Sequence, residues 1–220
     1  MTTNLFLLFP LFIACETFNS QTPVEDLPLV INNDNFVEEI DEIAPSNLYE
    51  PPSDLKLQTT GDKILLEARS YLDVPYEWNG RSKTKLDCLG LTSLAISSVT
   101  KTSWKQFPVN PIDFPTDKKY GSPVFGLAPL LRAELNEKLE QLQAGDFVAF
   151  LIEDYHHRLN NRLLHVVTDT NKREYGGWHT AIYAGNGNVI HAKPGDKVIE
   201  ESIERIGFDA IYVKRVDSSL

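Results

Sequence analysis

Cys88 is the residue of this chain whose surroundings best suit nucleophilic chemistry. It follows Asp87 and begins an apolar stretch rich in small residues, which predicts a helix from about Asp87 to Ser98 with the thiol in its first turn. There the helix dipole and the free backbone N–H groups favour a thiolate, and the same groups could hold the oxyanion of a tetrahedral intermediate. Because a thiol attacks a carbonyl as its thiolate, we expect a lowered pKa for Cys88 and a base nearby. The alternative is a buried cysteine that serves only as a small apolar residue.

Two histidines are candidates for that base and for the residue that orients it. His179 and His191 lie in apolar segments on either side of Gly185–Asn188, a sequence typical of a β-hairpin turn. A two-residue turn at Asn186-Gly187 would point the two histidines to opposite faces of the sheet. A three-residue loop over 185–187 would place residue 191 opposite residue 181 and both rings on one face. We expect the second register, because a base and its orienting partner must be within hydrogen-bond reach.

The remaining histidines do not form a metal-binding pattern. His156, His157 and His165 lack the i, i+4 spacing or the paired cysteines that zinc sites use. We interpret them as polar loop residues, of which His165 could line a substrate groove. The sequence therefore predicts no metal and no other cofactor.

The elements that must position these residues change in type along the chain. A helix is expected over 62–72 with Asp62 as its N-cap, and an amphipathic helix over 128–142, separated by the second helix and an irregular, proline-rich stretch at 101–126. Strands are then expected at 147–152, near 163–168, in the 179–192 hairpin and at 211–216. Helices followed by an antiparallel sheet predict an α+β domain.

The charge of the chain is concentrated at one end. The net charge is −10, and residues 1–54 hold ten of the 31 acidic residues and no Lys or Arg. Residues 55–220 are therefore balanced. A nucleic-acid-binding domain needs a basic face, so this balance argues against a nucleic-acid partner.

The N-terminus has the pattern of an export signal. Leu5–Ala14 is a ten-residue apolar run, too short to span a bilayer as a helix but typical of the core of a signal peptide. Phe12–Cys15 resembles a bacterial lipobox, in which Cys15 would be lipidated and anchor the protein to a membrane. Cleavage without lipidation, or a buried N-terminal helix, are the alternatives. We expect an exported protein of the bacterial cell envelope, whose single remaining cysteine would be Cys88.

Three sequence blocks, in order, resemble the NlpC/P60 family of papain-like cell-wall peptidases. Ala68–Leu94 (ARSYLDVPYEWNGRSKTKLDCLGLTSL) is similar to that family's Pro-Tyr-x-Trp-Gly-Gly segment and its Asp-Cys-x-Gly-Leu signature. Leu142–Phe150 (LQAGDFVAF) resembles the entry to a family strand. Trp178–Ala192 (WHTAIYAGNGNVIHA) resembles the family's His-x-x-Ile-Tyr-x-Gly strand and the His-Ala that follows. The resemblance implies the papain-like NlpC/P60 fold, with N-terminal helices packed on a central antiparallel sheet.

The resemblance also implies roles for individual residues. Cys88 would be the nucleophile, His179 the general base, and His191 the residue that holds the His179 ring in its useful tautomer. Tyr76 matches a family tyrosine whose hydroxyl can reach the reacting carbonyl. Asp87 matches a residue that in some members binds the free amine of a stem peptide. A packed tyrosine and an Asp N-cap are the structural alternatives.

Trp78 and Leu89 complete the set of expected substrate-binding residues. Trp78 belongs to the segment that follows Tyr76. Leu89 stands where the family often has Ser, so its backbone N–H is retained but a hydroxyl that could contact substrate is lost. Asn79 replaces the first glycine of the family's Gly-Gly pair, a mild change because Asn tolerates left-handed backbone angles.

The resulting organisation has three parts. Residues 1–15 are expected to be a signal peptide with a lipobox-like end, and 16–60 an acidic, largely flexible linker. Residues 61–220 would form the catalytic domain, with insertions at about 99–141 and 153–177 that could wall or cover the groove.

The resemblance implies hydrolysis of an amide bond in peptidoglycan stem peptides through a Cys88 thioester, with the bond between D-glutamate and the diamino acid as the favoured site. An amidase, or a lipid acyltransferase or thioesterase on the same fold, is an alternative chemistry. A catalytically silent lipoprotein that binds wall peptides is an alternative from another functional class.

Overall fold

The computed structural model describes residues 59–107, 118–153, 157–159, 162–164 and 167–216. All of them belong to the compact unit formed by residues 44–220. The expected signal peptide, Cys15 and nearly all of the expected linker lie outside the described residues.

Helix α1 spans Thr60–Ser70 and buries Ile64, Leu65 and Ala68 on one face. Its N-cap is Thr59 rather than Asp62. The Thr59 hydroxyl accepts from the Asp62 backbone N–H, and the Asp62 carboxylate accepts from the Thr59 backbone N–H. Asp62 therefore caps the helix from its third position, as the acidic member of a capping box.

Helix α2 spans Cys88–Thr100 with Asp87 as its N-cap, which confirms the second predicted helix to within two residues. A short hairpin of β1 (Arg81–Ser82) and β2 (Lys85–Leu86) leads into it. Gly90 in its first turn faces the carbonyl of Gly80, and a Cβ at Gly90 would collide with that oxygen. The first turn of α2 is therefore packed directly against the backbone that precedes the hairpin.

The predicted helix over 128–142 is wrong in its first part. Leu130–Leu131 forms strand β4, which pairs with β12 (Ala210–Arg215). Only α3 (Leu135–Lys138) is α-helical, between two 3₁₀ turns, η4 (Arg132–Glu134) and η5 (Leu139–Gln141). Backbone pairing with β12 outweighs the local amphipathic pattern, as tertiary context often does.

The remaining elements complete a large antiparallel sheet in the order β11-β10-β9-β5-β12-β3, with β4 beside β12 and β8 beside β9. The α+β class is thereby confirmed. The strands are β3 (Ser122–Pro123), β5 (Phe147–Glu153), β8 (Val167–Thr168), β9 (Glu174–Gly185), β10 (Asn188–Ala192) and β11 (Val198–Ser202). The pair β6 (His157–Leu159) and β7 (Arg162–Leu164) forms a separate hairpin, and η1 (Trp104–Gln106), η3 (Lys118–Tyr120) and η6 (Ile203–Arg205) are 3₁₀ turns.

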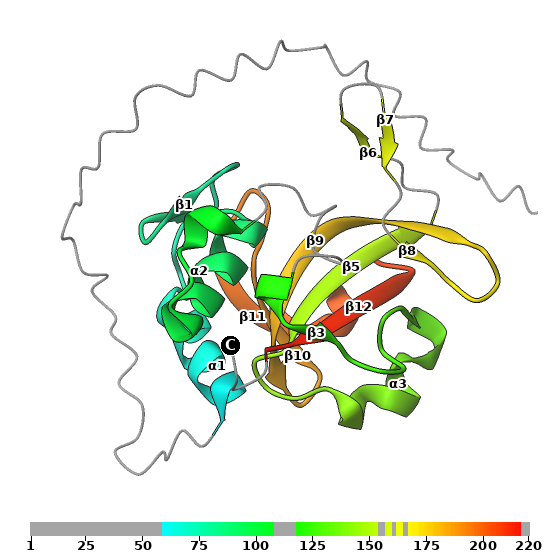
Figure 1. The fold of residues 1–220 in the computed structure, drawn as a ribbon. Helices are drawn as coiled ribbons and strands as arrows, with labels where there is room; N and C mark the ends of the chain where they lie inside the picture. Colours follow the sequence, from blue (N-terminus) through cyan, green and yellow to red (C-terminus); the bar gives the residue numbers. More distant parts are fainter. Residues whose placement is uncertain (1–58, 108–117, 154–156, 160–161, 165–166, 217–220) are drawn as a thin grey trace, which may run out of the picture. The chain divides into compact units, whose positions relative to one another are not determined.

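The sheet separates two apolar clusters. Alternate residues of β5 face opposite ways: Phe147, Ala149 and Leu151 pack in the cluster that contains residues of α1 and α2. Val148 and Phe150 pack instead with residues of β4 and α3. Helices α1 and α2 therefore cover one face of the sheet, and the segment that contains α3 covers part of the other, as Figure 1 shows.

A buried ion pair ties the entry of β5 to the last strand. Asp146 is almost fully buried and accepts from both Nε and Nη2 of Arg215 at 2.7 Å, and from the backbone N–H of Gln143. Burial raises the pKa of Asp146, an effect that the hydrogen bonds from Arg215 and Gln143 oppose. This pair fixes the turn from which the central strand starts.

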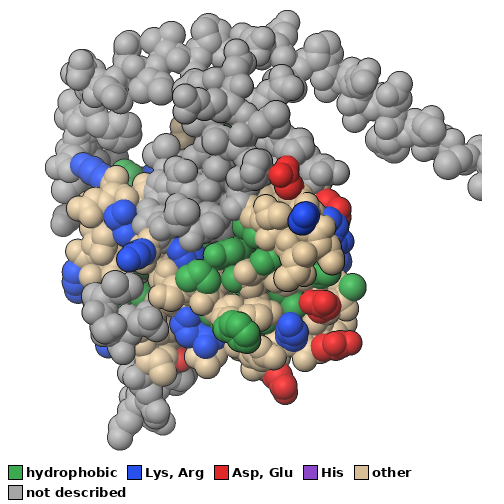
Figure 2. Space-filling view, turned by 45° about the vertical axis from the view of Figure 1, so that its right-hand side comes forward, with side chains coloured by type: hydrophobic (Ala, Val, Ile, Leu, Met, Phe, Trp, Pro, Cys, Tyr) green, Lys and Arg blue, Asp and Glu red, His purple; other side chains and the backbone are tan. Residues whose placement is uncertain are grey.

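The surface is mixed in charge. On the face shown in Figure 2, Lys and Arg side chains are spread among other types, Asp and Glu lie on the right, and hydrophobic side chains gather between them. Within the described part of the chain, the helices are too short or too polar to cross a membrane.

Candidate active site

The thiol of Cys88 lies at the N-terminus of α2, beside strand β9. It accepts hydrogen bonds from the hydroxyl and the backbone N–H of Thr180 and from the backbone N–H of Leu89. The Thr180 hydroxyl also lies 3.5 Å from that of Thr92 on α2. Because the Thr180 N–H belongs to the peptide that follows His179, the sulfur lies next to the main chain of that histidine.

Asp87 is held by the first turn of α2. Its carboxylate accepts from the backbone N–H of Gly90, with further hydrogen bonds from those of Asn79 and Leu89, and the residue is only 7% exposed. Burial raises the pKa of Asp87, while these donors and the charge of Arg81 lower it. Asp87 is thus the N-cap of α2. An amine of the substrate would approach a carboxylate that already accepts three backbone hydrogen bonds.

The expected lowering of the Cys88 pKa is wrong. Cys88 as a residue is partly exposed, but its sulfur is packed inside. Burial of the sulfur raises the pKa to about 11, and the charge of Asp87 adds to that effect. The three hydrogen bonds to the sulfur favour the thiolate but do not compensate. The negative charge of Asp87, the N-cap of α2, is therefore close enough to the sulfur to disfavour the thiolate. The helix dipole would favour it.

The two histidines meet across the β9–β10 hairpin in the expected register. Ile190 pairs with Ile182 and Val189 with Tyr183, so residue 191 faces residue 181. The register arises differently from the expectation. Gly185 pairs with Asn188 around a two-residue turn, and a bulge after that pair shifts the strands by one residue.

The rings are consequently in contact. Nε2 of His179 lies 2.7 Å from Nδ1 of His191, and the rings are perpendicular. The His179 ring also stacks on Trp178 and Phe150. Both histidines are nearly completely buried, so their orientations are fixed by packing as well as by the hydrogen bond.

Both rings are uncharged at neutral pH. Burial lowers the pKa of His179 to about 3, and the neighbouring His191 adds to that shift. Burial also lowers the pKa of His191, although the hydrogen bond and charge of Glu201 oppose it. The resting pair is therefore a neutral thiol with a neutral imidazole, rather than a thiolate with an imidazolium.

Two residues of this cluster escaped the sequence analysis. Glu201 lies on β11, and its Oε1 atom is 2.9 Å from Nε2 of His191. Its strand was not predicted, although the Pro194-Gly195 turn that precedes β11 is a hairpin signal and would have placed it beside β10. Thr180 was overlooked because it is an ordinary strand residue whose only signal is its position after His179.

The expected substrate-binding residues differ in exposure. Trp78 is 79% exposed, and Tyr76 is partly buried, with its phenol close enough to Cys88 and Asp87 for their charges to raise its pKa, after the larger effect of burial. The side chain of Leu89 is buried in the core, and its contact with the thiol is through the backbone N–H. Leu89 can therefore contribute to substrate binding through its backbone alone.

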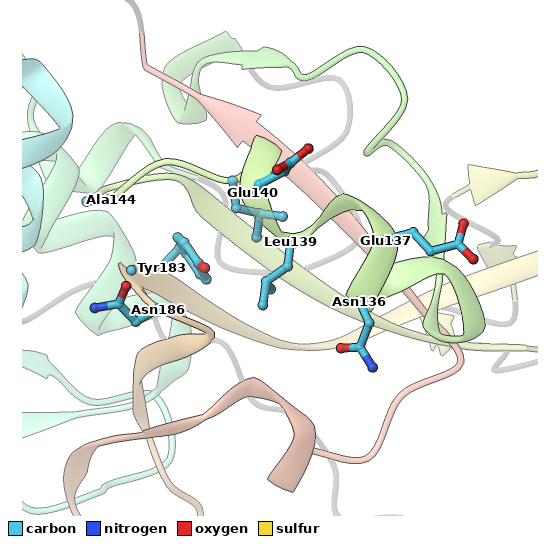
Figure 3. Close-up of a pocket in the computed structure, with 9 residues that line it drawn as sticks. Asn136, Glu137, Leu139, Glu140, Ala144, Tyr183 and Asn186 are labelled. Carbon is cyan, nitrogen blue, oxygen red and sulfur yellow. The ribbon is translucent and has the colours of Figure 1, made fainter.

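A pocket of about 630 Å³ lies elsewhere, between α3, η5 and the β9–β10 turn. Figure 3 shows Tyr183 and Asn186 on one side of it and Leu139, Glu140 and Asn136 on the other. Tyr183 is four residues from His179, about 13 Å along an extended strand. None of the residues expected to do chemistry lines this pocket, so we do not place the active site there.

The described residues contain no group of three or more His, Cys, Asp or Glu side chains arranged to hold a metal ion. His157 lies on β6, and His156 and His165 lie outside the described residues.

Comparison with known proteins gives a family match. Residues 73–216 match the model of the NlpC/P60 family. A probable endopeptidase of Corynebacterium glutamicum is 30% identical over 134 residues, which cover 61% of this chain and 44% of that protein. The chain therefore matches less than half the length of this relative.

Solved structures are also similar. The peptidoglycan hydrolase RipB of Mycobacterium tuberculosis is 20% identical, with a TM-score of 0.44, over 72% of this chain and 65% of RipB. RipD of the same organism, described as a non-catalytic NlpC/p60 domain protein adapted to peptidoglycan binding, is 18% identical with a TM-score of 0.44, over 72% of this chain and 98% of RipD.

Proposed function

Because the chain belongs to the NlpC/P60 family, we propose that it is a cysteine peptidase that hydrolyses an amide bond in peptidoglycan stem peptides. The matched range contains Cys88, His179 and His191. The description of its Corynebacterium relative as a probable endopeptidase supports the same reaction class.

The contact between His179 and His191 is the observation that carries the proposal. Because Nε2 of His179 is engaged by His191 at 2.7 Å, Nδ1 is the ring nitrogen left to take a proton from Cys88. The hydrogen bond from the Thr180 N–H to the sulfur supports this pairing, because Thr180 follows His179 along β9. Base and orienting residue are thus in the contact that general-base catalysis requires, and Cys88 lies beside Thr180, the neighbour of the base on β9.

Acylation begins from the neutral pair. As the sulfur attacks the substrate carbonyl, its proton passes to Nδ1 of His179, so no free thiolate is needed beforehand. The carbonyl oxygen becomes an oxyanion, and backbone N–H groups of the first turn of α2 are the donors nearest to it. That of Leu89 lies close enough to the sulfur to lower the pKa of Cys88.

The same base completes the cycle. The imidazolium of His179 gives its proton to the departing amine as the C–N bond breaks, which leaves a thioester on Cys88. A water molecule then loses a proton to His179 and attacks the thioester. The acid is released and the sulfur regains its proton from the imidazolium.

The substrate would bind along the segment before α2. Tyr76 would direct its hydroxyl to the reacting carbonyl, the exposed Trp78 would offer an apolar surface, and Asp87 would attract a free amine of the stem peptide. We propose the bond between D-glutamate and the diamino acid as the site of cleavage.

The decisive experiment compares the wild-type chain with Cys88→Ala on defined muropeptides and identifies the products by mass spectrometry. Cleavage between D-glutamate and the diamino acid by wild type alone supports the proposal. Release of the whole stem peptide from the sugar would indicate an amidase instead. Binding of muropeptides with no product from wild type would indicate a silent binding protein and overturn the proposal.

We also propose that the protein is exported and anchored at the membrane of the cell envelope through a lipid on Cys15. The apolar run before Cys15 supports this location. Expression in a bacterium that is fed a labelled fatty acid tests it. Label in the membrane fraction that disappears in Cys15→Ser is the expected result, whereas unlabelled protein in the medium would contradict anchoring.

A further inference from the structure

Glu201 extends the pair of histidines by a carboxylate. On β11 it pairs with Val189 of β10, two residues from His191, so that its side chain lies on the same face of the sheet as the His191 ring. Its Oε1 atom lies 2.9 Å from Nε2 of His191, and the Glu201 side chain is only 11% exposed. The three side chains form one continuous chain of hydrogen bonds, from β11 through β10 to β9.

The chemistry of a carboxylate determines where the protons of this chain lie. An ionised carboxylate can only accept hydrogen bonds, so Nε2 of His191 must carry a proton. In the neutral imidazole the other nitrogen, Nδ1, then has a lone pair and must accept. The only proton available for the 2.7 Å contact is one on Nε2 of His179. With both rings neutral, Nδ1 of His179 is left without a proton.

The other tautomers of the two histidines are excluded by repulsion between lone pairs. If His179 carried its proton on Nδ1, its Nε2 lone pair would face the lone pair of His191 across the same contact. Relief would require a proton on Nδ1 of His191, and Nε2 of that ring would then present a lone pair to the Glu201 carboxylate. Only one pattern satisfies all three groups.

We propose that Glu201 is a positioning residue that sets the tautomers of both histidines and leaves Nδ1 of His179 unprotonated, as the base for Cys88 must be. This inference rests on the proposed function, because the unprotonated nitrogen matters only if His179 is the base. Glu201 does not touch the thiol and acts through His191.

The same carboxylate helps when His179 becomes positively charged. After His179 has taken the proton of Cys88, its Nε2–H still donates to His191, which donates in turn to Glu201. The negative charge of Glu201 therefore stabilises the imidazolium along the chain of hydrogen bonds. Lys193 lies 3.6 Å from the same Oε1 atom and balances part of that charge.

The test replaces Glu201 by a residue of similar length that cannot accept a strong hydrogen bond. Glu201→Met is compared with Glu201→Asp, which keeps the carboxylate, and with Glu200→Met as the matched control. Glu200 is the adjacent residue, and its carboxylate is ion-paired with Arg69 on α1. Thermal unfolding and circular dichroism of each variant show whether it is folded.

The first measurement is the ¹⁵N NMR spectrum of the full chain, which distinguishes protonated from unprotonated imidazole nitrogens. In wild type and Glu200→Met we expect His179 and His191 both to carry their proton on Nε2. In Glu201→Met we expect this pattern to become mixed, with restoration in Glu201→Asp. A pure Nε2–H pattern in folded Glu201→Met overturns the inference, as does a proton on Nδ1 of His179 in wild type.

The second measurement is muropeptide cleavage. Loss of an outer residue that orients a catalytic ligand or base typically reduces activity by about 10–100-fold, and we expect kcat of Glu201→Met to fall in that range with little change in KM. Unchanged kcat in Glu201→Met overturns the inference. If wild type cleaves nothing, the proposed function fails, while the NMR result still decides whether Glu201 sets the tautomers.

Discussion

His179 and His191 are in contact because a bulge shifts the β9–β10 hairpin by one residue. The two-residue turn alone would place residue 191 opposite residue 182, and the two rings would point to opposite faces. With the bulge, residue 191 faces residue 181 and the nitrogens are 2.7 Å apart. The contact is thus a property of the backbone register, which holds the rings in place before substrate arrives.

The role of His191 can be separated from its bulk by two substitutions. His191→Ala removes the partner of His179 and leaves Glu201 without its hydrogen bond, so we expect kcat for muropeptide cleavage to fall by about 100-fold. His191→Asn keeps a polar partner of the kind found in papain-like triads and should retain more activity. Steady-state kinetics of both variants test this order, and equal loss in the two would contradict an orienting role.

The raised pKa of Cys88 has a direct chemical consequence. At pH 7 a thiol with a pKa of about 11 has about 300-fold less thiolate than a free cysteine. We expect iodoacetamide to modify the folded protein correspondingly slowly, with a rate that rises about tenfold per pH unit between pH 6 and 9. The measurement uses a Cys15→Ser background, so that Cys88 is the only thiol.

Urea-unfolded protein is the reference for that experiment. A plateau in the alkylation rate below pH 8 would indicate a preformed thiolate. The neutral resting pair would then be wrong, and acylation would start from an ion pair.

How far the sequence could predict this site depends on the range of the interactions. The first turn of α2 is local: Asp87, Cys88 and Gly90 are close in sequence, and the helix and its cap were foreseeable. The pKa of Cys88 is not local, because it depends on the packing of the sulfur against Thr180 of β9. Likewise, β4 could not be foreseen from residues 130–131, since its partner β12 lies about 80 residues away.

Acid should destabilise the fold through the buried histidines. The pKa of His179 falls from its ordinary value of 6.5 to about 3 on folding, so between these values the unfolded chain binds more protons than the native protein. The contribution of His179 to the free energy of unfolding is therefore fully present above pH 6.5 and is lost as the pH falls towards 3. His191, whose pKa is also lowered, acts in the same direction.

The size of this effect at pH 5 follows from the shift of His179 alone. We expect the free energy of unfolding to be about 2 kcal/mol lower than at pH 7. Urea unfolding at the two pH values measures it, with His179→Asn as the control that should lose most of the difference. A pH dependence that is unchanged in His179→Asn would show that other groups cause the acid sensitivity.

Thr180 is expected to matter through its hydroxyl. Thr180→Val keeps the shape of the side chain and the backbone N–H but removes one of the three hydrogen bonds to the sulfur. The sulfur gains negative charge during the reaction, and a hydrogen bond to a charged group contributes about 1.5–3 kcal/mol. We therefore expect kcat of Thr180→Val to fall by about tenfold or more. Thr180→Ser retains the hydroxyl and should keep most of the activity. Equal kinetics for Val and Ser at this position would show that the backbone donor alone is sufficient.

The Asp146–Arg215 pair offers a test of stability that leaves the proposed catalytic residues untouched. Asp146→Asn removes the negative partner of a bidentate contact and leaves the guanidinium beside a neutral amide, at one end of the central strand β5. Breaking a fully buried pair costs about 3–5 kcal/mol. Since Arg215 is 30% exposed, we expect a smaller loss of about 2 kcal/mol in the free energy of unfolding.

Glu77→Gln, which breaks the exposed pair between Glu77 and Lys85, is the matched control and should change stability by less than about 0.5 kcal/mol. Urea denaturation at pH 7 measures both, and equal effects would mean that burial of the Asp146 carboxylate gives the contact no extra strength.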